Sequence, residues 1–358
     1  MPVTPLPLLE PPASLCLLRL SALGDVSHMV PVIRSIRMQW PDTRISWCLG
    51  RVEHQLVGDI DGIEFLVFDK ASGWRGAGDF RRRLRGRTFD VLMHAQVSLR
   101  ANLLSLMFRS PLKLGFDQQR SRDLHGLFIN RRIPPQPGQH VLDGFFSFAE
   151  TLGVTQRQMR WDIPVPPPAR QAALDLFPDD QPVLVISPCS SHPLRNWRAE
   201  RYAQLADYAI ARYRFRVVLC GGPSAMEREM GAAITGAMQQ APLNLIGKDT
   251  IKQLLAVLER ASVLISPDSG PMHLATAVGT PVIGLHAASN PKRSGPYLSQ
   301  QWCVDRYDAA ARKFLGKPAD AIKWGTKIEQ SGVMDLITVD DVVERLDAFM
   351  ARPMPAGA

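Results

Sequence analysis

The sequence contains few cysteines, no long apolar run and no cluster of metal-binding residues. Its five cysteines are odd in number and widely spaced along 358 residues, without a Cys-x-x-Cys pair, which argues against a disulfide framework and a zinc site. No stretch has the ~18 consecutive apolar residues that a membrane-spanning helix needs. Residues 1–12 are rich in proline but lack the basic region of a secretory signal. We therefore expect a disordered lead-in over 1–12 and a cytoplasmic protein with reduced thiols.

Acidic residues are the minority among the charges, with 34 Asp and Glu against 42 Lys and Arg and a net charge of +8. Such an excess suits a nucleic acid, an anionic lipid or an anionic substrate. The basic residues concentrate in the first half of the chain, over 81–87 and between 109 and 132. No interleaved aromatic residues or nucleic-acid motif accompany them, so a nucleic acid is the weakest of the three partners.

Strand-like apolar runs alternate with helical segments throughout the chain. The first half has predicted strands over 15–20, 45–49, 64–68 and 89–94 and predicted helices over 28–40, 101–108 and 141–152. The second half has predicted strands over 183–187, 216–220, 244–246, 261–265 and 282–285 and predicted helices over 199–213, 226–238, 251–259, 272–278 and 339–350. This alternation is typical of α/β folds with parallel sheets.

A run of prolines between Ile163 and Pro168 separates the two halves. We predict an α/β protein with two facing Rossmann-like domains and a cleft between them. The predicted boundaries are a first domain over 13–162, a linker over 163–181, a second domain over 182–338 and a C-terminal helix and tail over 339–358.

Polar residues follow the predicted strand 261–265, where a turn leads into the helix 272–278. Asp268 and Ser269 lie in this turn, and His273 lies one helical turn further on. The carboxyl ends of parallel strands and the amino ends of helices bind ligands, and free N–H groups there favour phosphate. Asp268 and Ser269 could instead serve only as helix caps.

The stretch from Arg19 to His28 follows the first predicted strand in the same way. It lacks the Gly-x-Gly-x-x-Gly fingerprint of dinucleotide-binding proteins. Gly24 allows a tight turn beside a ligand, and Asp25 could act as a general base. A capping role for Asp25 is equally compatible with the local sequence.

Two further loops follow predicted strands of the second half. Ser187, Ser190 and Arg195 offer hydroxyls and a cation that suit a diphosphate, although Arg195 could simply be a solvated loop residue. Gly222 would allow a nucleotide to approach the backbone, and Glu227 could hold ribose hydroxyls.

The motif Asp268-Ser-Gly-Pro-Met-His-Leu-Ala resembles the donor-nucleotide signature of the lipopolysaccharide heptosyltransferases, glycosyltransferase family 9. Gly24, Asp25 and Pro31 match a Gly-Asp-x-x-x-x-x-Pro pattern of that family, and Arg195-x-Trp197 stands where the family usually has Lys-x-Trp. Arg keeps the charge but replaces a compact ammonium by a planar fork. The segment 121–131 resembles the acceptor-side segment of heptosyltransferase I. The resemblance extends from about Leu15 to Met350, although 305–333 carries no motif that can be interpreted.

This resemblance implies a GT-B glycosyltransferase that moves heptose from ADP-heptose to the Kdo (keto-octulosonate) of inner-core lipid A with inversion. Asp25 would be the catalytic base. The nucleotide-sugar site would comprise Ser187, Ser190, Arg195, Gly222, Glu227, Lys248, Asp268, Ser269, Gly270, Pro271, Met272 and His273. The acceptor site would comprise Gly24, His28, Arg120, Arg122, Arg131 and His140. For His28 and the basic residues, a core or solvated position is the alternative.

We expect no metal and no cofactor beyond the donor, and peripheral, electrostatic contact with the inner face of the bacterial inner membrane. The pair Asp59 and Asp61 lies outside the predicted donor domain and reads as a polar turn. Three other functions stay open: a transferase with another nucleotide sugar or acceptor, a nucleotide-sugar epimerase, and a non-catalytic sugar-nucleotide binder that regulates envelope polysaccharide synthesis.

Overall fold

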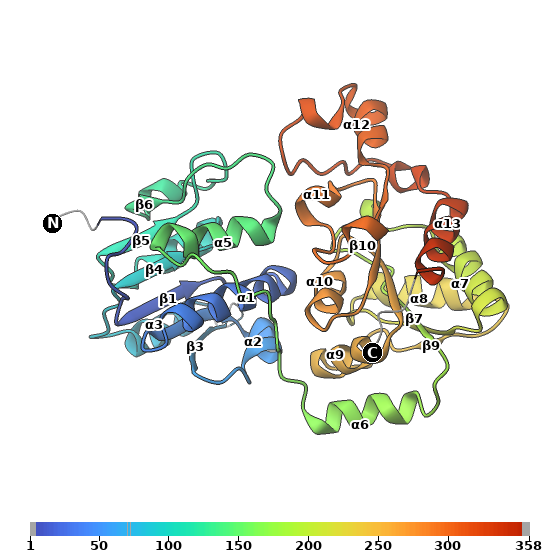
Figure 1. The fold of residues 1–358 in the computed structure, drawn as a ribbon, viewed down its shortest axis with the longest axis horizontal. Helices are drawn as coiled ribbons and strands as arrows, with labels where there is room; N and C mark the ends of the chain where they lie inside the picture. The colour runs from blue at the N-terminus through green and yellow to red at the C-terminus, as the bar shows by residue number, and fades with distance from the viewer. Residues whose placement is uncertain (1–4, 70, 72, 353–358) are drawn as a thin grey trace. The chain divides into compact units, whose positions relative to one another are not determined.

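A computed structural model describes residues 5–69, 71 and 73–352. The chain forms two compact units that divide between Pro164 and Val165. Each unit contains one six-stranded sheet in which all neighbouring strands run parallel. Helices flank both sheets (Figure 1). The predicted α/β class with two Rossmann-like halves is therefore confirmed.

Unit 1, the N-terminal half, has the strand order β3-β2-β1-β4-β5-β6. Its strands are β1 (Ser14–Leu18), β2 (Arg44–Gly50), β3 (Ile63–Phe68), β4 (Val91–His94), β5 (Leu112–Gly115) and β6 (Arg131–Arg132). Its helices are α1 (Leu23–Gln39), α2 (Arg51–Val57), α3 (Gly73–Arg83), α4 (Leu99–Ser105) and α5 (Val141–Leu152), with a short 3-10 turn η2 (His125–Leu127).

The helix α1 begins earlier than the sequence pattern predicts, at Leu23 instead of residue 28. Pro31 therefore lies inside the helix and not in its first turn. An internal proline removes one backbone hydrogen bond and costs a helix ~3 kcal/mol. The buried face of α1, which includes Val26, Met29 and Ile33, offsets this cost because the helix packs against α5 and α2.

Unit 2, the C-terminal half, has the order β12-β11-β10-β7-β8-β9. Its strands are β7 (Val183–Ile186), β8 (Arg216–Leu219), β9 (Leu243–Asn244), β10 (Val263–Pro267), β11 (Val282–His286) and β12 (Val304–Asp305). Its helices are α6 (Pro167–Leu176), α7 (Ala199–Tyr213), α8 (Ala225–Ala237), α9 (Ile251–Arg260), α10 (Gly270–Ala277), α11 (Pro291–Ser294), α12 (Tyr307–Leu315) and α13 (Val339–Met350), with a 3-10 turn η3 (Pro193–Arg195).

The two sheets have the same topology, because β7 to β12 repeat the order of β1 to β6. In each unit the chain builds one half of the sheet, returns to the centre and builds the other half. The direction reverses between β1 and β4 in unit 1 and between β7 and β10 in unit 2. In open α/β sheets such a switch point leaves a crevice at the carboxyl edge, where ligands bind.

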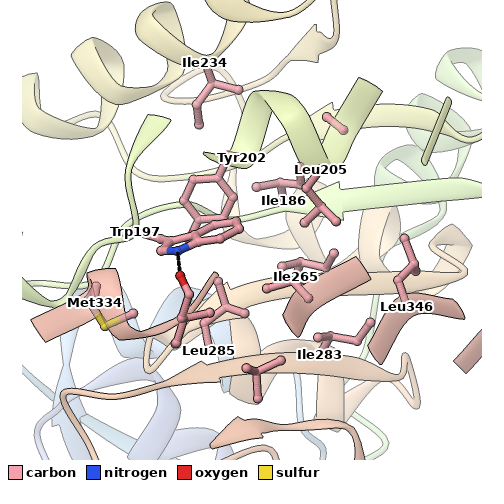
Figure 2. Close-up of a cluster of buried hydrophobic side chains, with 14 of the residues drawn as sticks. Ile186, Trp197, Tyr202, Leu205, Ile234, Ile265, Ile283, Leu285, Met334 and Leu346 are labelled. Carbon is pink, nitrogen blue, oxygen red and sulfur yellow. Dashed lines mark hydrogen bonds between the residues drawn. The ribbon is translucent and has the colours of Figure 1, made fainter. Parts of the chain in front are cut away.

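The main core of unit 2 lies between its sheet and the helices α7, α8 and α13 (Figure 2). Ile186, Ile265 and Ile283 project from three neighbouring strands into this core. Trp197 is fully buried there, and its indole N–H donates a 2.9 Å hydrogen bond to the Ile337 carbonyl, immediately before α13. The loop that follows β7 is thereby fixed to the C-terminal helix.

The segments at the predicted domain boundaries contain more structure than the sequence pattern predicts. Within the predicted linker 163–181, α6 begins with prolines in its first turn, where the missing N–H costs no hydrogen bond, and packs on α9. In the predicted lead-in, residues 1–4 lie outside the described residues, whereas Leu8 donates its N–H to the Leu152 carbonyl at 3.0 Å. The helix α13 packs on α7 within unit 2.

All five cysteines are buried and free. Burial raises the pKa of each thiol above its ordinary value, so the thiols stay protonated. Among the helices that the structure describes, none combines the length and the apolar character needed to cross a bilayer.

Candidate functional site

The predicted site residues in the loops after β7 and β10 lie at the switch point of unit 2. Asp268 and Ser269 directly follow β10, and Ser187, Ser190 and Arg195 follow β7, its neighbour in the sheet. Because parallel strands end at the same edge, the two loops lie side by side.

Asp268 is a mostly buried carboxylate surrounded by cations and donors. Its Oδ2 accepts a 3.1 Å hydrogen bond from the Ser294 hydroxyl and lies 3.7 Å from Lys327 Nζ. Its Oδ1 lies 4.0 Å from His273 Nε2. Burial would raise the pKa of Asp268, but Lys327, His286 and His273 outweigh burial and lower it. Asp268 is therefore ionised at neutral pH and orients the groups around it.

The first turn of α10 carries neither a side-chain cap nor an acidic residue. Ser269 occupies the N-cap position, but its hydroxyl shares a 2.7 Å hydrogen bond with the Ser266 hydroxyl instead of capping the helix. Pro271 has no N–H, so Gly270 and Met272 present the N–H groups of this turn. A helix start of this kind attracts an anion. The capping alternative therefore fails for Ser269.

Arg195 ends the 3-10 turn η3 and is buried. Its Nη2 donates to the Ser191 hydroxyl at 2.7 Å, and its Nε lies 3.3 Å from Glu329 Oε1. Ser190 shapes the same loop, since its N–H donates to Asn196 and its hydroxyl donates to the His192 carbonyl at 3.0 Å. Arg195 is therefore a fixed cation in a built loop and not a solvated surface arginine.

Lys327 and Glu329 are candidate site residues that the sequence reading missed. They lie in the segment 305–333 and flank Ile328, which is buried in the core and donates its N–H to the Ala288 carbonyl at 2.8 Å. The two charged side chains reach Asp268 and Arg195, respectively. An alternation of charged, apolar and charged residues is the only local signal, and it is too common to identify a site.

The predicted ribose-binding residue Glu227 is held in the loop after β8. Its Oε1 accepts from the Gly222 N–H at 2.7 Å and its Oε2 from the Ser224 hydroxyl at 2.6 Å. Glu227 therefore has a structural role at the start of α8. A side chain at Gly222 would force the Glu227 carboxylate to shift, since an added Cβ would lie 2.9 Å from its Oε2.

The turn after β9 lies against this glycine loop, because the Gly247 N–H donates to the Gly221 carbonyl at 3.0 Å. Lys248 turns back on its own loop and donates to the Asn244 carbonyl at 2.7 Å. Asp249, which follows it, has a buried Oδ2 that finds no hydrogen-bond partner among the described residues. Burial raises the pKa of Asp249 from its ordinary value of 3.8 to about 6.

In unit 1, Asp25 lies in the first turn of α1 at the switch point between β1 and β4. Its Oδ2 accepts from Arg19 Nη2, while Arg19 Nη1 donates to the Ala95 carbonyl at 2.6 Å. Gln96 joins the same two loops by accepting from the Leu20 N–H at 2.6 Å. The carboxylate is about one-third exposed. Across the described residues, no hydrogen bond reaches its Oδ1 and no capping bond involves it.

Arg19 is a third residue whose importance the sequence reading missed. Its side chain is 11% exposed and its guanidinium also lies over the Phe145 ring, at 5.1 Å from the centroid. It therefore fixes the orientation of the Asp25 carboxylate from a buried position. The signal was its place in the same motif, six residues before Asp25.

The predicted acceptor residues occupy different environments within unit 1. The Gly24 carbonyl accepts a 2.7 Å hydrogen bond from the Ser27 hydroxyl. His28 is buried and meets His140 edge to face at 5.7 Å between ring centroids, while His140 caps α5 through Nδ1. Both histidines therefore belong to the packing of α1 against α5.

The three predicted acceptor arginines also differ in environment. Arg120 pairs with Asp117 and donates to Gln139 at 3.1 Å, so its guanidinium holds the loop after β5 together. Arg122 is exposed, and Arg131 is half-buried in β6. In the described ranges of the chain, no three or more His, Cys, Asp and Glu residues are grouped as metal ligands.

Comparison with known proteins places this geometry in a family. A sequence model of glycosyltransferase family 9 (heptosyltransferase) matches residues 77–323. Lipopolysaccharide core heptosyltransferase OpsX of Haemophilus influenzae is 38% identical over 337 residues, which cover 94% of this chain and 97% of that protein.

Solved structures agree on the fold. The glycosyl transferase family 9 protein from Veillonella parvula has a TM-score of 0.76 at 23% identity, covering 94% of this chain and 97% of that one. The E. coli heptosyltransferase WaaC with ADP has a TM-score of 0.70 at 19% identity, covering 94% and 99%. The expected GT-B fold is thus confirmed, and the chain belongs to glycosyltransferase family 9, the heptosyltransferases.

Proposed function

We propose that this glycosyltransferase moves L-glycero-D-manno-heptose from ADP-heptose to the Kdo of lipid A in the lipopolysaccharide inner core. The observation that carries the proposal is the uncapped start of α10 beside Asp268, Arg195 and Lys327. It supplies N–H groups and cations for a diphosphate at one switch point. A relative that acts on the lipopolysaccharide core and a similar structure that holds ADP favour the same donor and acceptor class.

In this proposal the diphosphate lies against the first turn of α10, between Arg195 and Lys327. Arg195 can contact a phosphate while keeping Ser191, because a guanidinium has five N–H donors in a fixed fork. An ammonium held by the same two neighbours would have fewer donors left. The pairing of Arg195 with Glu329 gives a physical reason for arginine at a position where the family usually has lysine.

We assign the general base to Asp25. The acceptor hydroxyl would give its proton to the Asp25 carboxylate as its oxygen bonds to the anomeric carbon of heptose. The bond from that carbon to the β-phosphate oxygen would break, and the electron pair would leave with ADP. Attack from the face opposite to ADP inverts the anomeric configuration. Arg19 would keep Oδ2 occupied and leave Oδ1 to receive the proton.

Positive charge from Arg195, Lys327 and the helix start would stabilise ADP as it leaves. No step of the proposal needs a metal, and loss of turnover on chelation would contradict this part of it. We assign the remaining donor contacts to Ser187, Ser190, Gly222, Glu227 and Lys248, which lie in or directly after the loops that follow β7, β8 and β9. Both carboxylate oxygens of Glu227 already accept hydrogen bonds, from Gly222 and Ser224. Glu227 would therefore bind the ribose either with its remaining acceptor capacity or after it breaks one of these bonds.

For the acceptor, we propose that Arg122 and Arg131 pair with Kdo carboxylates or lipid phosphates, because their guanidinium groups suit such anions. Arg120 would position the loop that carries Arg122. The enzyme would work at the cytoplasmic face of the inner membrane as a peripheral protein, since its acceptor is a lipid.

The first experiment is ADP release by the purified protein given ADP-heptose, with and without Kdo-bearing lipid A. We expect ADP release that depends on the acceptor. NMR of the product should show that the anomeric configuration of heptose is inverted relative to ADP-heptose. Donor binding without release would indicate another acceptor or a non-catalytic binder. Absence of donor binding would mean that the donor assignment is wrong.

A further inference from the structure

Five leucines of unit 1 are exposed in two segments that hydrogen bonds join to each other. They are Leu99, Leu103, Leu106, Leu124 and Leu127, with exposed fractions between 52% and 77%. We call them the leucine surface. Isolated exposed leucines are ordinary, but a contiguous apolar group on a folded domain marks an interaction site.

The first segment is α4 with its C-cap residue. Leu99, Leu103 and Leu106 follow at helical spacing on one side, while Ala101 and Leu104 are buried on the other. A helix that covers a sheet normally turns a polar face outward. Because α4 is apolar on both sides, its outer side is suited to a second apolar environment.

The second segment is the loop that contains η2, and hydrogen bonds fix it to α4. The Asp123 carboxylate accepts from the Leu99 N–H at 3.1 Å, and the Asp123 carbonyl accepts from Asn102 Nδ2 at 2.7 Å. His125 Nδ1 and Asn102 Oδ1 lie 2.9 Å apart. Leu124 has a left-handed backbone with φ of 60°, which is unusual for a leucine. The two exposed leucines of this loop are therefore held out rigidly.

Cations surround these leucines. Arg100, Arg122 and Arg132 are exposed, and the Arg132 guanidinium lies so close to Gly126 in η2 that an added Cβ would collide with it. Residues 99–132 include only Asp117 and Asp123 as acids. Asp117 is buried and paired with Arg120, and Asp123 is bonded to α4. The surroundings of the leucine surface are thus clearly positive.

We propose that the leucine surface docks on an anionic phospholipid bilayer, with leucines at the acyl boundary and arginines on the headgroup phosphates. Apolar side chains and basic residues on one surface are the features of an interfacial membrane contact. A protein partner would need acidic groups arranged around an apolar pocket. An anionic bilayer presents apolar acyl chains beneath negatively charged phosphates over its whole surface. The inference rests on the proposed function for its purpose, because it brings unit 1 to the surface that holds the lipid acceptor.

The test is sedimentation of the full chain with vesicles of phosphatidylethanolamine and phosphatidylglycerol, and with vesicles of phosphatidylcholine alone. We expect binding to the anionic vesicles that weakens with salt. The double variant Leu103→Ser/Leu127→Ser should lose about ten-fold or more of this affinity. Arg100→Gln/Arg132→Gln should lose a comparable amount, since each basic residue at a membrane surface contributes several-fold. The matched control Leu174→Ser/Leu315→Ser changes exposed leucines of unit 2 and should bind as the unaltered chain does.

Unaltered ADP binding and thermal unfolding would show that the leucine variant is folded. Equal vesicle binding by the leucine variant and the unaltered chain would overturn the inference, as would equal binding to both vesicle types. Self-association of the unaltered chain that the leucine variant loses would assign the surface to a second copy and also overturn it. Vesicle binding needs neither donor nor acceptor, so its failure is distinct from failure of heptosyl transfer.

Discussion

The two units share one strand order but carry opposite chemistry at their switch points. In unit 1 the helix that leaves the switch point, α1, has Asp25 in its first turn and Arg19 against it. In unit 2 the helix α10 follows the other switch-point strand, β10, which is the counterpart of β4; it starts with Gly270-Pro271-Met272 and has no acidic residue in its first turn. A carboxylate neutralises the positive end of a helix, whereas an empty first turn attracts an anion.

The difference teaches that the same scaffold can host a base or an anion site, depending on one or two residues at a helix start. Asp268 does not contradict this rule. It lies before α10 and is compensated by Lys327, His273 and Ser294, so it does not use the N–H groups of the helix. If the comparison is right, variants of unit 1 change turnover and variants of unit 2 change donor affinity.

The largest expected effect is on turnover, from Asp25→Ala. We expect kcat to fall about 1000-fold, because a positioned general base contributes on the order of 10²–10⁴. The dissociation constant of ADP, measured by calorimetry, should stay within about two-fold. The exposed acid Asp42 gives the matched control Asp42→Asn. A parallel loss of ADP affinity or of thermal stability would instead assign Asp25 a structural role.

A smaller effect, on affinity, is expected from Arg195→Ala. The dissociation constant of ADP should rise about 30-fold, as one charge-assisted contact to phosphate is removed. Adenosine, which has no phosphate, should bind both proteins equally. Arg195→Lys should recover part of the affinity. Unchanged ADP binding would remove Arg195 from the phosphate site and weaken the contrast between the units.

Lys327→Ala should raise the dissociation constant of ADP by about ten-fold, less than Arg195→Ala because Lys327 is more exposed. Lys323→Ala is the control, since Lys323 is an exposed lysine of the same segment. Calorimetry with ADP and adenosine would show whether the loss depends on phosphate. Equal losses for both ligands would mean that Lys327 acts through the fold of unit 2.

The smallest effect is on stability and depends on pH. Burial raises the pKa of Asp249 to about 6. Above that pH the buried charge lowers the free energy of unfolding, and this destabilisation is lost as the pH falls to the ordinary value of 3.8. Asp249→Asn should therefore raise the Tm by roughly 3 °C at neutral pH and leave it unchanged near pH 4. Thermal unfolding followed by circular dichroism at both values tests this. A larger gain at the acidic pH would reverse the sign and refute the burial argument.

The central strands and the unit 2 motif could be predicted from the sequence because their signals are local. The apolar runs around Val263–Pro267 and Val282–His286 are short and buried on both faces, and the intervening turn carries contiguous polar residues. The same logic located Asp25. By contrast, β5, β6 and α12 are amphipathic or very short, so periodicity alone did not separate them from loops.

Contacts between segments distant in the sequence were beyond such patterns. Lys327 meets Asp268 across 59 positions, because Ile328 is drawn into the core and sets the direction of its neighbours. Likewise, nothing in the motif around Arg120 shows that Asp117 and Gln139 already engage its guanidinium. Local sequence identifies the types of groups available, whereas tertiary packing decides which of them are free to meet a ligand.

The hydrogen bond from Trp197 to the Ile337 carbonyl has a practical meaning for protein engineering. Arg195 lies two residues before this indole, and α13 begins two residues after its acceptor. A truncation that ends the chain before Ile337 would therefore disturb the loop after β7, which lies more than a hundred residues earlier in the sequence.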